Sequence, residues 1–163
     1  MRVFWYDRCG QEVHRPLGCR SPSRGTGSRR NPRQPSPSPL REVARRSLTE
    51  RCHRLAAITT SAVRRLGLPL RGLALVDGWY GLGLVRGHCY WASSEIHVYL
   101  VATDQQHPAW LTYRTEHDLL ETLAHEVAHL VNGGHDPLFW KYLAERVRPT
   151  FLEEMHREYE FAG

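Results

Sequence analysis

The sequence predicts a single domain of the α+β class. Residues 40–66 and 115–132 each repeat apolar side chains at steps of three and four, which is the spacing of one buried helix face. Between these stretches, residues 71–101 contain short apolar and alternating runs that are typical of β-strands. A chain of 163 residues, 41% of them hydrophobic, suits one compact domain with a tail and is too short for two ordinary domains.

The first 39 residues differ in composition from the rest of the chain. Residues 21–39 consist mainly of Ser, Pro, Gly and Arg and contain no aliphatic residue. Such a stretch cannot bury enough apolar surface to offset its ordering entropy, so we expect a disordered linker there. The expected organisation is a short N-terminal segment at 1–20, the linker at 21–39 and a folded domain at 40–163.

The N-terminal segment contains one candidate metal site. The string DRCG at residues 7–10 resembles the second half of a Cys-x-x-Cys-Gly zinc knuckle, but Tyr6 stands where the first cysteine would be. Cys9, His14 and Cys19 could still bind a metal, although they lack paired spacing. The alternative is a degenerate or disordered segment without a metal.

The first helix has recognisable ends. It is expected to start at Ser38-Pro39, because proline is favoured at the first helical position, and to end at Gly67. The face predicted to be buried consists of Leu48, Cys52, Leu55, Thr59, Ala62 and Leu66. The opposite, basic face carries Arg45, Arg46, Arg51, Arg54, Arg64 and Arg65. That face is either solvated or binds an acidic partner.

Three antiparallel strands are expected after this helix. Residues 73–76 form a short apolar run, and residues 84–91 form a second run broken by Gly87. Residues 95–101 alternate polar with apolar side chains, as a half-buried strand does. Residues 103–114 are expected to form a connecting loop.

The last third of the chain is predicted to be helical. A helix with a capping-box-like start is expected from Thr115, and the glycine pair at 133–134 stops it. A further helix is expected over about 137–147, ended by Pro149. Residues 151–161 are expected to form an acidic helix.

Charge is distributed unevenly along the chain. Residues 1–65 hold fifteen arginines and four acidic residues, whereas residues 66–163 hold seven basic and thirteen acidic residues. Clustered arginine favours phosphate, so non-specific DNA binding through the Arg-rich N-terminal half is a candidate property. No apolar run of membrane-spanning length and no secretory signal is visible. We therefore expect a cytoplasmic protein without a membrane partner, associated with the nucleoid if it binds DNA.

The motif that carries chemistry is His125-Glu126-Val127-Ala128-His129, an H-E-x-x-H pattern within the second predicted helix. Histidines four residues apart lie on one helix face, with Cβ atoms about 5–6 Å apart, so both imidazoles can bind one Zn²⁺. Glu126 lies about 100° around the helix from His125. From there it can act as the general base toward a water on the open side of the metal.

The leading candidate for the third zinc ligand is His135. On an unbroken helix it would point away from the metal, but Gly133 or Gly134 can adopt a left-handed conformation and return the chain. Three nitrogens plus a water make an open, catalytic site rather than a closed, structural one. The alternative third ligands are Asp136, Glu145, Glu153 and Glu154.

Several other polar or aromatic side chains are weaker candidates for a functional role. Tyr113 and Tyr142 could each stabilise an oxyanion, and no sequence feature selects between them. The thiol of Cys89 lacks the partner motif of a nucleophile. The residues expected to be structural, on strands or packed beneath the site, are His88, His97, Phe139 and Trp140.

The string HEVAHLVNGGHDPLFWKYL resembles the active-site segment of the SprT-like, WLM and YgjP-like minimal zinc metallopeptidases. These families share H-E-x-x-H, five intervening residues, a third histidine and then Phe-Trp or Phe-Tyr. The positions of this chain that match are His125, Glu126, His129, His135, Phe139 and Trp140. Residues 86–89 and 96–100 are similar, in part, to the strand elements W-G-S-C and I-x-L-N of that group.

The resemblance covers about residues 40–148 and implies a zincin-like minimal metallopeptidase fold. That fold has an N-terminal helix, a small antiparallel three-stranded sheet, an HExxH active-site helix and following C-terminal helices. It also implies proteolysis of proteins bound to DNA. The histidine spacing is shared with metzincins, but Asn132 stands at their glycine position and no Met-turn is visible.

The sequence therefore predicts a zinc metalloendopeptidase that acts on protein or peptide substrates. Zn²⁺ is expected on His125, His129 and His135, with Glu126 as the general base. An extended substrate is expected beside residues 95–101, if that strand is a sheet edge. One alternative is a nucleic-acid- or partner-binding module on an inactive HExxH fold, for which an intact Glu126 would be unnecessary. The other is zinc-assisted hydrolysis of a non-peptide bond.

Overall fold

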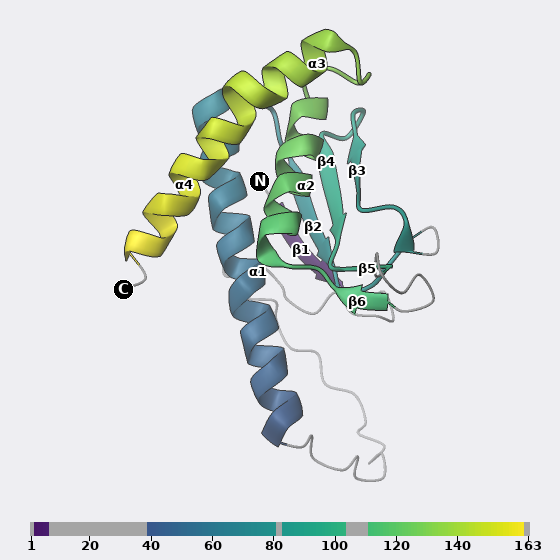
Figure 1. The fold of residues 1–163 in the computed structure, drawn as a ribbon, viewed down its shortest axis with the longest axis vertical. Helices are drawn as coiled ribbons and strands as arrows, with labels where there is room; N and C mark the ends of the chain where they lie inside the picture. The colour runs from purple at the N-terminus through teal and green to yellow at the C-terminus, as the bar shows by residue number, and fades with distance from the viewer. Residues whose placement is uncertain (1, 7–38, 81–82, 104–110, 162–163) are drawn as a thin grey trace, which may run out of the picture.

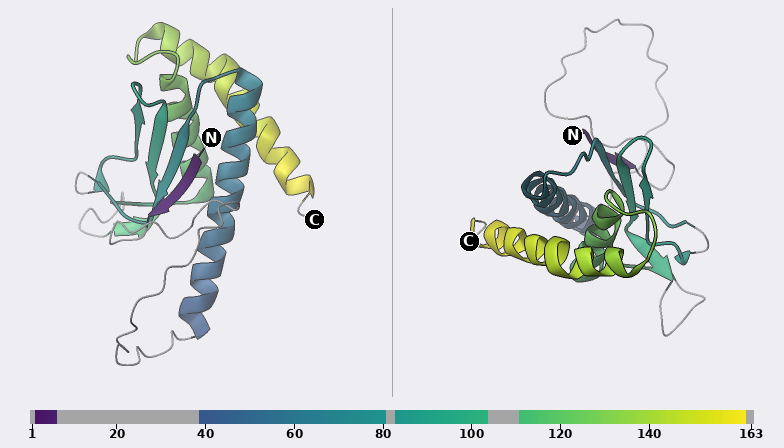
Figure 2. Two further views of the ribbon diagram at one scale, coloured as in Figure 1. Left: turned by 180° about the vertical axis from the view of Figure 1, so that it is seen from behind. Right: turned by 90° about the horizontal axis from the view of Figure 1, so that it is seen from above.

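The computed structural model describes residues 2–6, 39–80, 83–103 and 111–161, which form an α+β fold, as predicted (Figure 1). The strands are β1 (Arg2–Tyr6), β2 (Gly72–Val76), β3 (Gly87–Tyr90), β4 (Glu95–Tyr99), β5 (Val101–Thr103) and β6 (Leu111–Tyr113). The helices are α1 (Pro39–Leu66), α2 (Glu116–His129), α3 (Pro137–Tyr142), a π-helical turn (Leu143–Val147) and α4 (Arg148–Phe161). Seen from above, the helices lie on one side of the main sheet (Figure 2).

The main sheet is mixed and has four strands in the order β1-β2-β4-β3. β1 and β4 both run parallel to β2, and β3 runs antiparallel to β4. The expectation of three antiparallel strands is therefore wrong in strand number and direction. Alternation of apolar residues marks a strand, but it does not reveal the partner or the direction of pairing.

β1 adds a strand from the beginning of the chain. It pairs with β2 in the register from Arg2 opposite Gly72 to Tyr6 opposite Val76. This pairing differs from the expectation that the domain begins at residue 40, because residues 2–6 belong to the same sheet. Residues 7–38, with the candidate ligands Cys9, His14 and Cys19 and the expected linker, lie outside the described residues.

α1 matches the predicted helix. It runs from Pro39 to Leu66, and Gly67, at a left-handed φ of 67°, follows it directly. Its predicted inner face is buried, with Cys52, Leu55, Thr59 and Ala62 at most 1% exposed. The other face is not simply solvated, because two of its arginines, Arg54 and Arg65, contact acidic groups of this chain.

These arginine contacts hold α1 to the acidic parts of the domain. Arg54 forms an ion pair with Glu116 at the start of α2, and Arg65 bonds to both Glu153 and Glu154 of α4. The acidic C-terminal half thus neutralises part of the basic helix face within the molecule. Among the described side chains, these arginines are less available to an outside phosphate than the sequence suggests.

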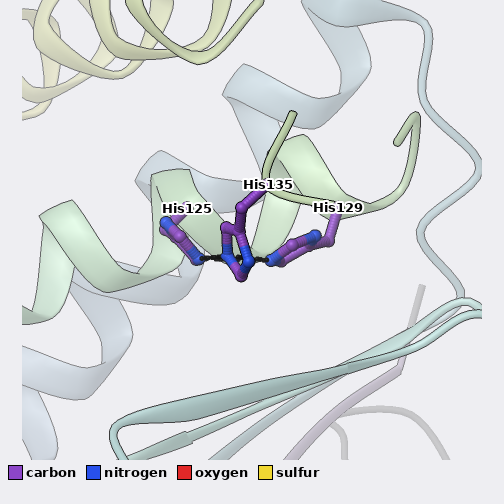
Figure 3. A group of neighbouring side chains, drawn as sticks. All are labelled: His125, His129 and His135. Carbon is purple, nitrogen blue, oxygen red and sulfur yellow. Dashed lines mark hydrogen bonds between the residues drawn. The ribbon is translucent and has the colours of Figure 1, made fainter. Parts of the chain in front are cut away.

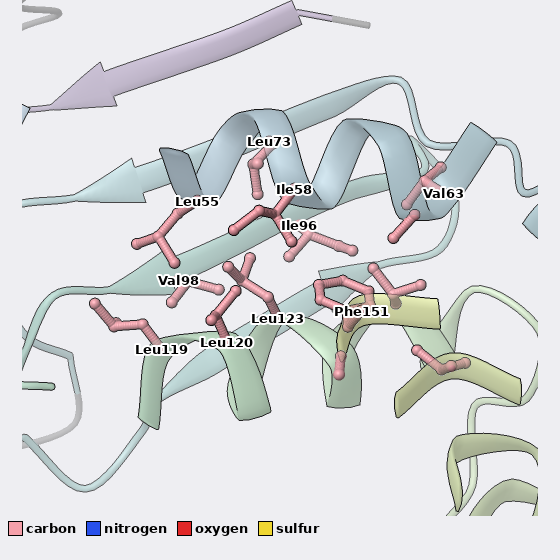
Figure 4. Packing of buried hydrophobic residues seen from close by; sticks show 14 of the residues in the cluster. Leu55, Ile58, Val63, Leu73, Ile96, Val98, Leu119, Leu120, Leu123 and Phe151 are labelled. Carbon is pink, nitrogen blue, oxygen red and sulfur yellow. The ribbon is translucent and has the colours of Figure 1, made fainter. Parts of the chain in front are cut away.

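The core lies between the sheet and the helices (Figure 4). Leu73 of β2 and Ile96 of β4 face Leu123 of α2 and Ile58 of α1, and each of these side chains is at most 1% exposed. Burying such side chains supplies roughly 1.5–3 kcal/mol each, which fixes α2 against the sheet. α2 therefore has a rigid support along its whole buried face.

The segment after β4 was expected to be a loop over residues 103–114. Instead Leu111–Tyr113 forms β6, which pairs antiparallel with β5 in a small second sheet. Leu100 bends the chain between β4 and β5, so the single strand expected at 95–101 is two short strands.

The C-terminal helices follow one another without a break, although Pro149 was expected to end the helix over 137–147. The π-helical turn Leu143–Val147 lies directly before this proline. Proline lacks an N–H and clashes with the carbonyl four residues earlier, and a π-helical turn, with its i to i+5 bonding, relieves both problems. α4 therefore continues from Arg148 to Phe161 and packs against α1.

None of the helices in the described part of the chain combines the length and apolar character that crossing a membrane requires.

Candidate active site

Three histidine rings converge at the C-terminal end of α2 (Figure 3). His125 and His129 are one helical turn apart, and His135 comes from the loop between α2 and α3. The Nε2 atoms of His125 and His129 are 3.1 Å apart. The Nε2 atom of His135 lies 2.9 Å from that of His125 and 3.1 Å from that of His129. The structure thus brings together the three histidines that the sequence singles out.

The geometry of this histidine cluster fits a tetrahedral metal ion such as Zn²⁺. Nitrogens at the usual Zn–N distance from a tetrahedral centre are about 3.3–3.4 Å apart, close to the separations here. His129 donates from Nδ1 to the carbonyl oxygen of Asn132 at 3.0 Å, because a carbonyl can only accept. The lone pair of its Nε2 is then directed toward the other two rings, as in metal sites whose histidines are held by backbone carbonyls.

Two of the histidine rings, those of His125 and His129, are held in the neutral form that binds metal. Burial, followed by the neighbouring His129 and His135 and by the charge of Arg148, lowers the pKa of His125 to about 4. Burial is also the main cause of the lowered pKa of His129. Both rings are therefore unprotonated near pH 7 and can offer nitrogen lone pairs to a cation.

The loop that carries His135 is closed by the side chain of Asn132. Its Oδ1 accepts from the backbone N–H of Gly134 at 3.0 Å, and its Nδ2 donates to Asp136 at 2.8 Å. Among the described glycines, only Gly67 and Gly83 have positive φ, so the expected left-handed glycine at 133 or 134 is wrong. α2 ends at His129, and an Asx turn, rather than a glycine cap, returns the chain to the cluster.

Gly133 is needed for close packing rather than for the expected left-handed turn. A Cβ atom at this position would lie 1.8 Å from the indole ring of Trp91. Trp91 lies in the turn between β3 and β4 and is 59% exposed. The glycine therefore allows the tip of this β-hairpin to lie directly on the loop that carries His135.

Two aromatic side chains of α3 support the cluster. Phe139 is fully buried, and its ring centroid lies 4.5–5.0 Å from those of all three histidines, which confirms that it packs beneath the site. Trp140 was also expected beneath the site but is 48% exposed. It stacks on His135 and donates from Nε1 to the carbonyl oxygen of that residue at 3.0 Å. Trp140 therefore holds His135 from the side that faces the solvent.

Glu126 lies beside the histidine cluster in a buried position. It is 7% exposed, and burial raises the pKa of its carboxyl group to about 7. Its nearest wall is Gly87 of β3, where a Cβ atom would come within 2.8 Å of Oε1. A carboxylate whose pKa lies near neutrality is suited to accept and return a proton.

A cleft runs past the cluster between α2 and β3. It has two parts, of about 350 Å³ and 450 Å³, and both are lined by Gly87, His125 and Glu126. His125 and Glu126 therefore lie where the two parts meet, and His129 and His135 line the smaller part. β3 is an outer strand of the main sheet, whereas β4 is paired on both sides. A substrate was expected beside residues 95–101 if that strand is a sheet edge; β4 does not meet this condition, and β3 forms the wall of the cleft.

One buried arginine joins the two walls of the cleft. The side chain of Arg114 is 2% exposed and donates to the carbonyl oxygens of Arg86 and Tyr99, both at 3.1 Å. It also bonds to the carboxylate of Asp118 at 2.7 Å and to the hydroxyl of Thr122 on α2. Arg114 thus connects the strand side of the cleft to α2 and fixes the distance between them.

The alternative third ligands do not join the histidine cluster. Asp136 accepts from the backbone N–H of Phe139 and caps α3, and both Glu153 and Glu154 bond to Arg65. Within the described residues, no carboxylate, Glu145 included, belongs to a group of three potential ligands.

Of the other residues that the sequence singles out, some line the cleft and the rest lie elsewhere. His88 and His97 are opposite each other on β3 and β4, and His88 lines the smaller part of the cleft. Tyr113 donates to Asp77, and neither it nor Tyr142 lines either part of the cleft. Cys89 lines the cleft, but burial and then the charge of Glu126 raise the pKa of its thiol to about 11. Cys89 is therefore protonated near pH 7 and is a poor nucleophile.

Three residues of the site escape the sequence analysis: Asn132, Arg114 and Arg148. The spacing Asn-x-Gly followed by Asp136 was a usable signal for an Asx turn. No local pattern marks Arg148, because its partner Glu121 lies 27 positions earlier. The local pair of Arg114 with Asp118 does not reveal its carbonyl partners at Arg86 and Tyr99. Arg148 lines the larger part of the cleft from the start of α4.

Comparison with known proteins gives limited similarity. No family model matches the sequence, and no curated protein matches it significantly. Among solved structures, Wss1 from Saccharomyces cerevisiae is similar at 20% identity and a TM-score of 0.49, covering 72% of this chain and 84% of that chain. A Wss1 mutant is similar at 19% identity and the same TM-score of 0.49, covering 72% of this chain and 86% of the other. At this level the likeness assigns neither a family nor an activity to the chain.

Proposed function

We propose that the protein is a zinc-dependent metallopeptidase that hydrolyses peptide bonds of protein substrates. The observation that carries this proposal is the convergence of three histidine Nε2 atoms in a cleft that the buried Glu126 also lines. Three histidine nitrogen ligands leave a coordination position for a water or a substrate, which distinguishes a catalytic zinc site from a closed structural one.

The side chains divide the work of this reaction. His125, His129 and His135 would hold Zn²⁺, which when bound polarises a carbonyl group and makes a water more acidic. Glu126 accepts the proton of the attacking water and passes it to the nitrogen of the leaving amine. Phe139 packs beneath the three rings and excludes water from behind them, and Trp140 holds His135 from the solvent side.

An extended substrate would lie along β3. Because β3 is an outer strand that borders both parts of the cleft, its free edge can accept a further strand by main-chain hydrogen bonding. Recognition through the backbone explains how such a site could cut many protein sequences. Side-chain preference would then depend on the residues that line the two parts of the cleft.

The H-E-x-x-H segment, with its third histidine and Phe-Trp, supports membership of the SprT-like, WLM and YgjP-like group. The arginine excess of the first 65 residues supports DNA-associated proteins as substrates. Since Arg54 and Arg65 are paired within the domain, phosphate contacts would fall mainly to the other arginines of this half.

The decisive experiment is a proteolysis assay on the zinc-loaded full chain, with casein as substrate, with and without DNA. We expect chelator-sensitive cleavage by the wild type and none by Glu126→Gln. Glu126→Gln should still bind one zinc ion, because only the base is removed. Zinc binding without cleavage of any protein substrate would contradict the peptidase proposal. It would favour the inactive binding module or hydrolysis of a non-peptide bond, which ester and phosphoester substrates would distinguish.

A further inference from the structure

The larger part of the cleft is rich in charged side chains. It extends from the histidine cluster along the N-terminal half of α2 and includes both strand-side and helix-side groups. The charged residues that line it are Arg86, Asp118, Glu121, Glu126 and Arg148. A substrate residue next to the scissile bond must meet this set of charges, so they can select its side chain.

Two of these charges are already satisfied within the protein. Asp118 accepts from the buried Arg114 at 2.7 Å and from Arg86 at 2.8 Å. The Asp118 carboxylate therefore has two cationic partners, and Arg86 is held against the wall of the cleft. Apart from Glu126, the proposed base, this leaves Arg148 and Glu121 as the pair that can respond to a ligand.

Arg148 retains donors for a second carboxylate. Its Nε and Nη2 bond to one oxygen of Glu121, Oε2, at 3.0 and 2.9 Å, and its side chain is 46% exposed. A guanidinium group has five N–H donors in a fixed plane, so it can bind two carboxylates at once. Glu121 thus orients the guanidinium without exhausting it.

The surroundings favour an acidic over a basic side chain. A basic side chain approaching Glu121 would also approach Arg148 and the divalent cation proposed for the histidine cluster, and like charges repel. The uncharged lining includes Leu84, 74% exposed, and Trp140, 48% exposed. These two side chains can contact the methylene groups of a longer acidic residue.

We propose that Arg148, oriented by Glu121, binds an acidic side chain of the substrate next to the scissile bond. The preferred substrates are therefore protein segments with Glu or Asp on the side of that bond that occupies the larger part of the cleft. This inference rests on the proposed function, which supplies the peptide-binding cleft, the scissile bond and the cation at the histidine cluster. Arg148 is a specificity-determining residue, whereas Glu121 is a positioning residue.

A binding experiment tests this without turnover. The zinc-loaded Glu126→Gln protein is titrated with fluorescent peptides that carry Glu, Gln or Lys on either side of the central bond. We expect about 3- to 10-fold tighter binding of the Glu peptide than the Gln peptide for one of the two positions, and weaker binding of Lys. The preference should shrink as salt is raised, because charge interactions are screened.

The added substitutions Arg148→Gln and Arg148→Glu identify the residue. The first should abolish the preference and the second should reverse it toward Lys. Arg146→Glu is the matched control, because it makes the same change of charge two residues away. Arg146 is exposed and does not line the cleft. Zinc content, measured in each variant, reports folding of the site.

Each possible result supports or contradicts the assignment of Arg148. Equal binding of the Glu, Gln and Lys peptides at both positions, or an unchanged preference in Arg148→Glu, would overturn the assignment. If Arg146→Glu also lost the preference for the Glu peptide, the preference would be a general effect of charge, and the assignment to Arg148 would be overturned. A wild type that binds acidic peptides through Arg148 but hydrolyses none would contradict the proposed peptidase function and leave this binding assignment standing.

Discussion

Gly87 of β3 lies so close to Glu126 of α2 that a methyl group on its Cα would come within 2.8 Å of the carboxylate oxygen. The same methyl group would lie 3.0 Å from Thr122. Neither neighbour can be avoided without moving the strand or turning the carboxylate. The absence of a side chain at residue 87 therefore sets where the proposed base is held.

Gly87→Ala should lower kcat for peptide hydrolysis by about 10- to 100-fold, because the Glu126 carboxylate is displaced from its working position. Zinc content should stay near that of the wild type, since the atoms nearest to the added methyl group belong to Glu126 and Thr122 and not to a histidine. Gly78→Ala is the matched control, as its new Cβ would meet only Val76 at an ordinary 3.8 Å. Equal activity of both variants would show that Glu126 tolerates displacement.

Removing any one of the three clustered histidines should empty the metal site. We expect His125→Ala, His129→Ala and His135→Ala each to lose bound zinc, because two remaining nitrogens give too weak a site. Asp136→Asn and Glu154→Gln should keep it. Elemental analysis of the purified proteins measures this directly, and full occupancy in His135→Ala would transfer the third-ligand role to another group.

Asn132→Ala should weaken zinc binding by about 10-fold without abolishing it. The substitution removes the bonds to Gly134 and Asp136 that shape the His135 loop, but it keeps the backbone carbonyl that accepts from His129. Competition with a chromogenic chelator gives the affinity. An unchanged affinity would mean that Trp140 alone holds His135 in place.

Asp118 should contribute pH-dependent stability. Burial pushes its pKa up, but the hydrogen bond and charge of Arg114 and the charge of Arg86 outweigh burial, and the net pKa is below its usual range. A carboxyl group with a lowered pKa stabilises the fold above its unfolded-state pKa of about 3.9, and this contribution disappears as the pH falls through the folded-state value.

Asp118→Asn should therefore cost about 1–3 kcal/mol in the free energy of unfolding at pH 7, because the buried Arg114 loses its charged partner. The difference from the wild type should shrink below about pH 4. Urea unfolding of both proteins at pH 7 and pH 3 measures it. A difference that is constant with pH would mean that the carboxylate charge does not matter.

The arginines of residues 8–33 should dominate any DNA binding. Replacing them with glutamine keeps β1, which a truncation of the N-terminal residues would remove from the sheet. The positions are Arg8, Arg15, Arg20, Arg24, Arg29, Arg30 and Arg33. For every phosphate that the substituted protein no longer binds, the slope of log affinity against log salt should flatten by about 0.7–0.9. Equal slopes in the two proteins would assign these residues to a linker role.

The local parts of the site are predictable from sequence, because spacing on a helix is a local property. His125, Glu126 and His129 lie where the helical period puts them, and Thr115 caps α2 through a bond from the N–H of Asp118, as expected. His135 does return to the other two histidines. The glycine mechanism expected for that return is wrong, since a side-chain turn at Asn132 produces it instead.

The long-range parts are not predictable from local patterns. β1 pairs with β2, and each paired residue lies 70 positions further along the chain, as Gly72 does from Arg2. Nothing within residues 2–6 specifies that partner. The choice of β3 rather than β4 as the cleft wall likewise depends on strand order, which alternation does not encode. Pro149 is a local signal that a π-helical turn overrides.

The position of Arg114 in the chain also has a consequence for biosynthesis. Arg86 and Tyr99, whose carbonyls it binds, leave the ribosome before it, and Thr122 on α2 leaves after it. The strand side of the cleft therefore has no opposite wall during most of translation, and α2 must emerge before the two sides can be joined. A nascent chain that ends before residue 115 would contain all six described strands but not α2, so Leu73 and Ile96 would lack the cover of that helix, and a chaperone would recognise this apolar surface.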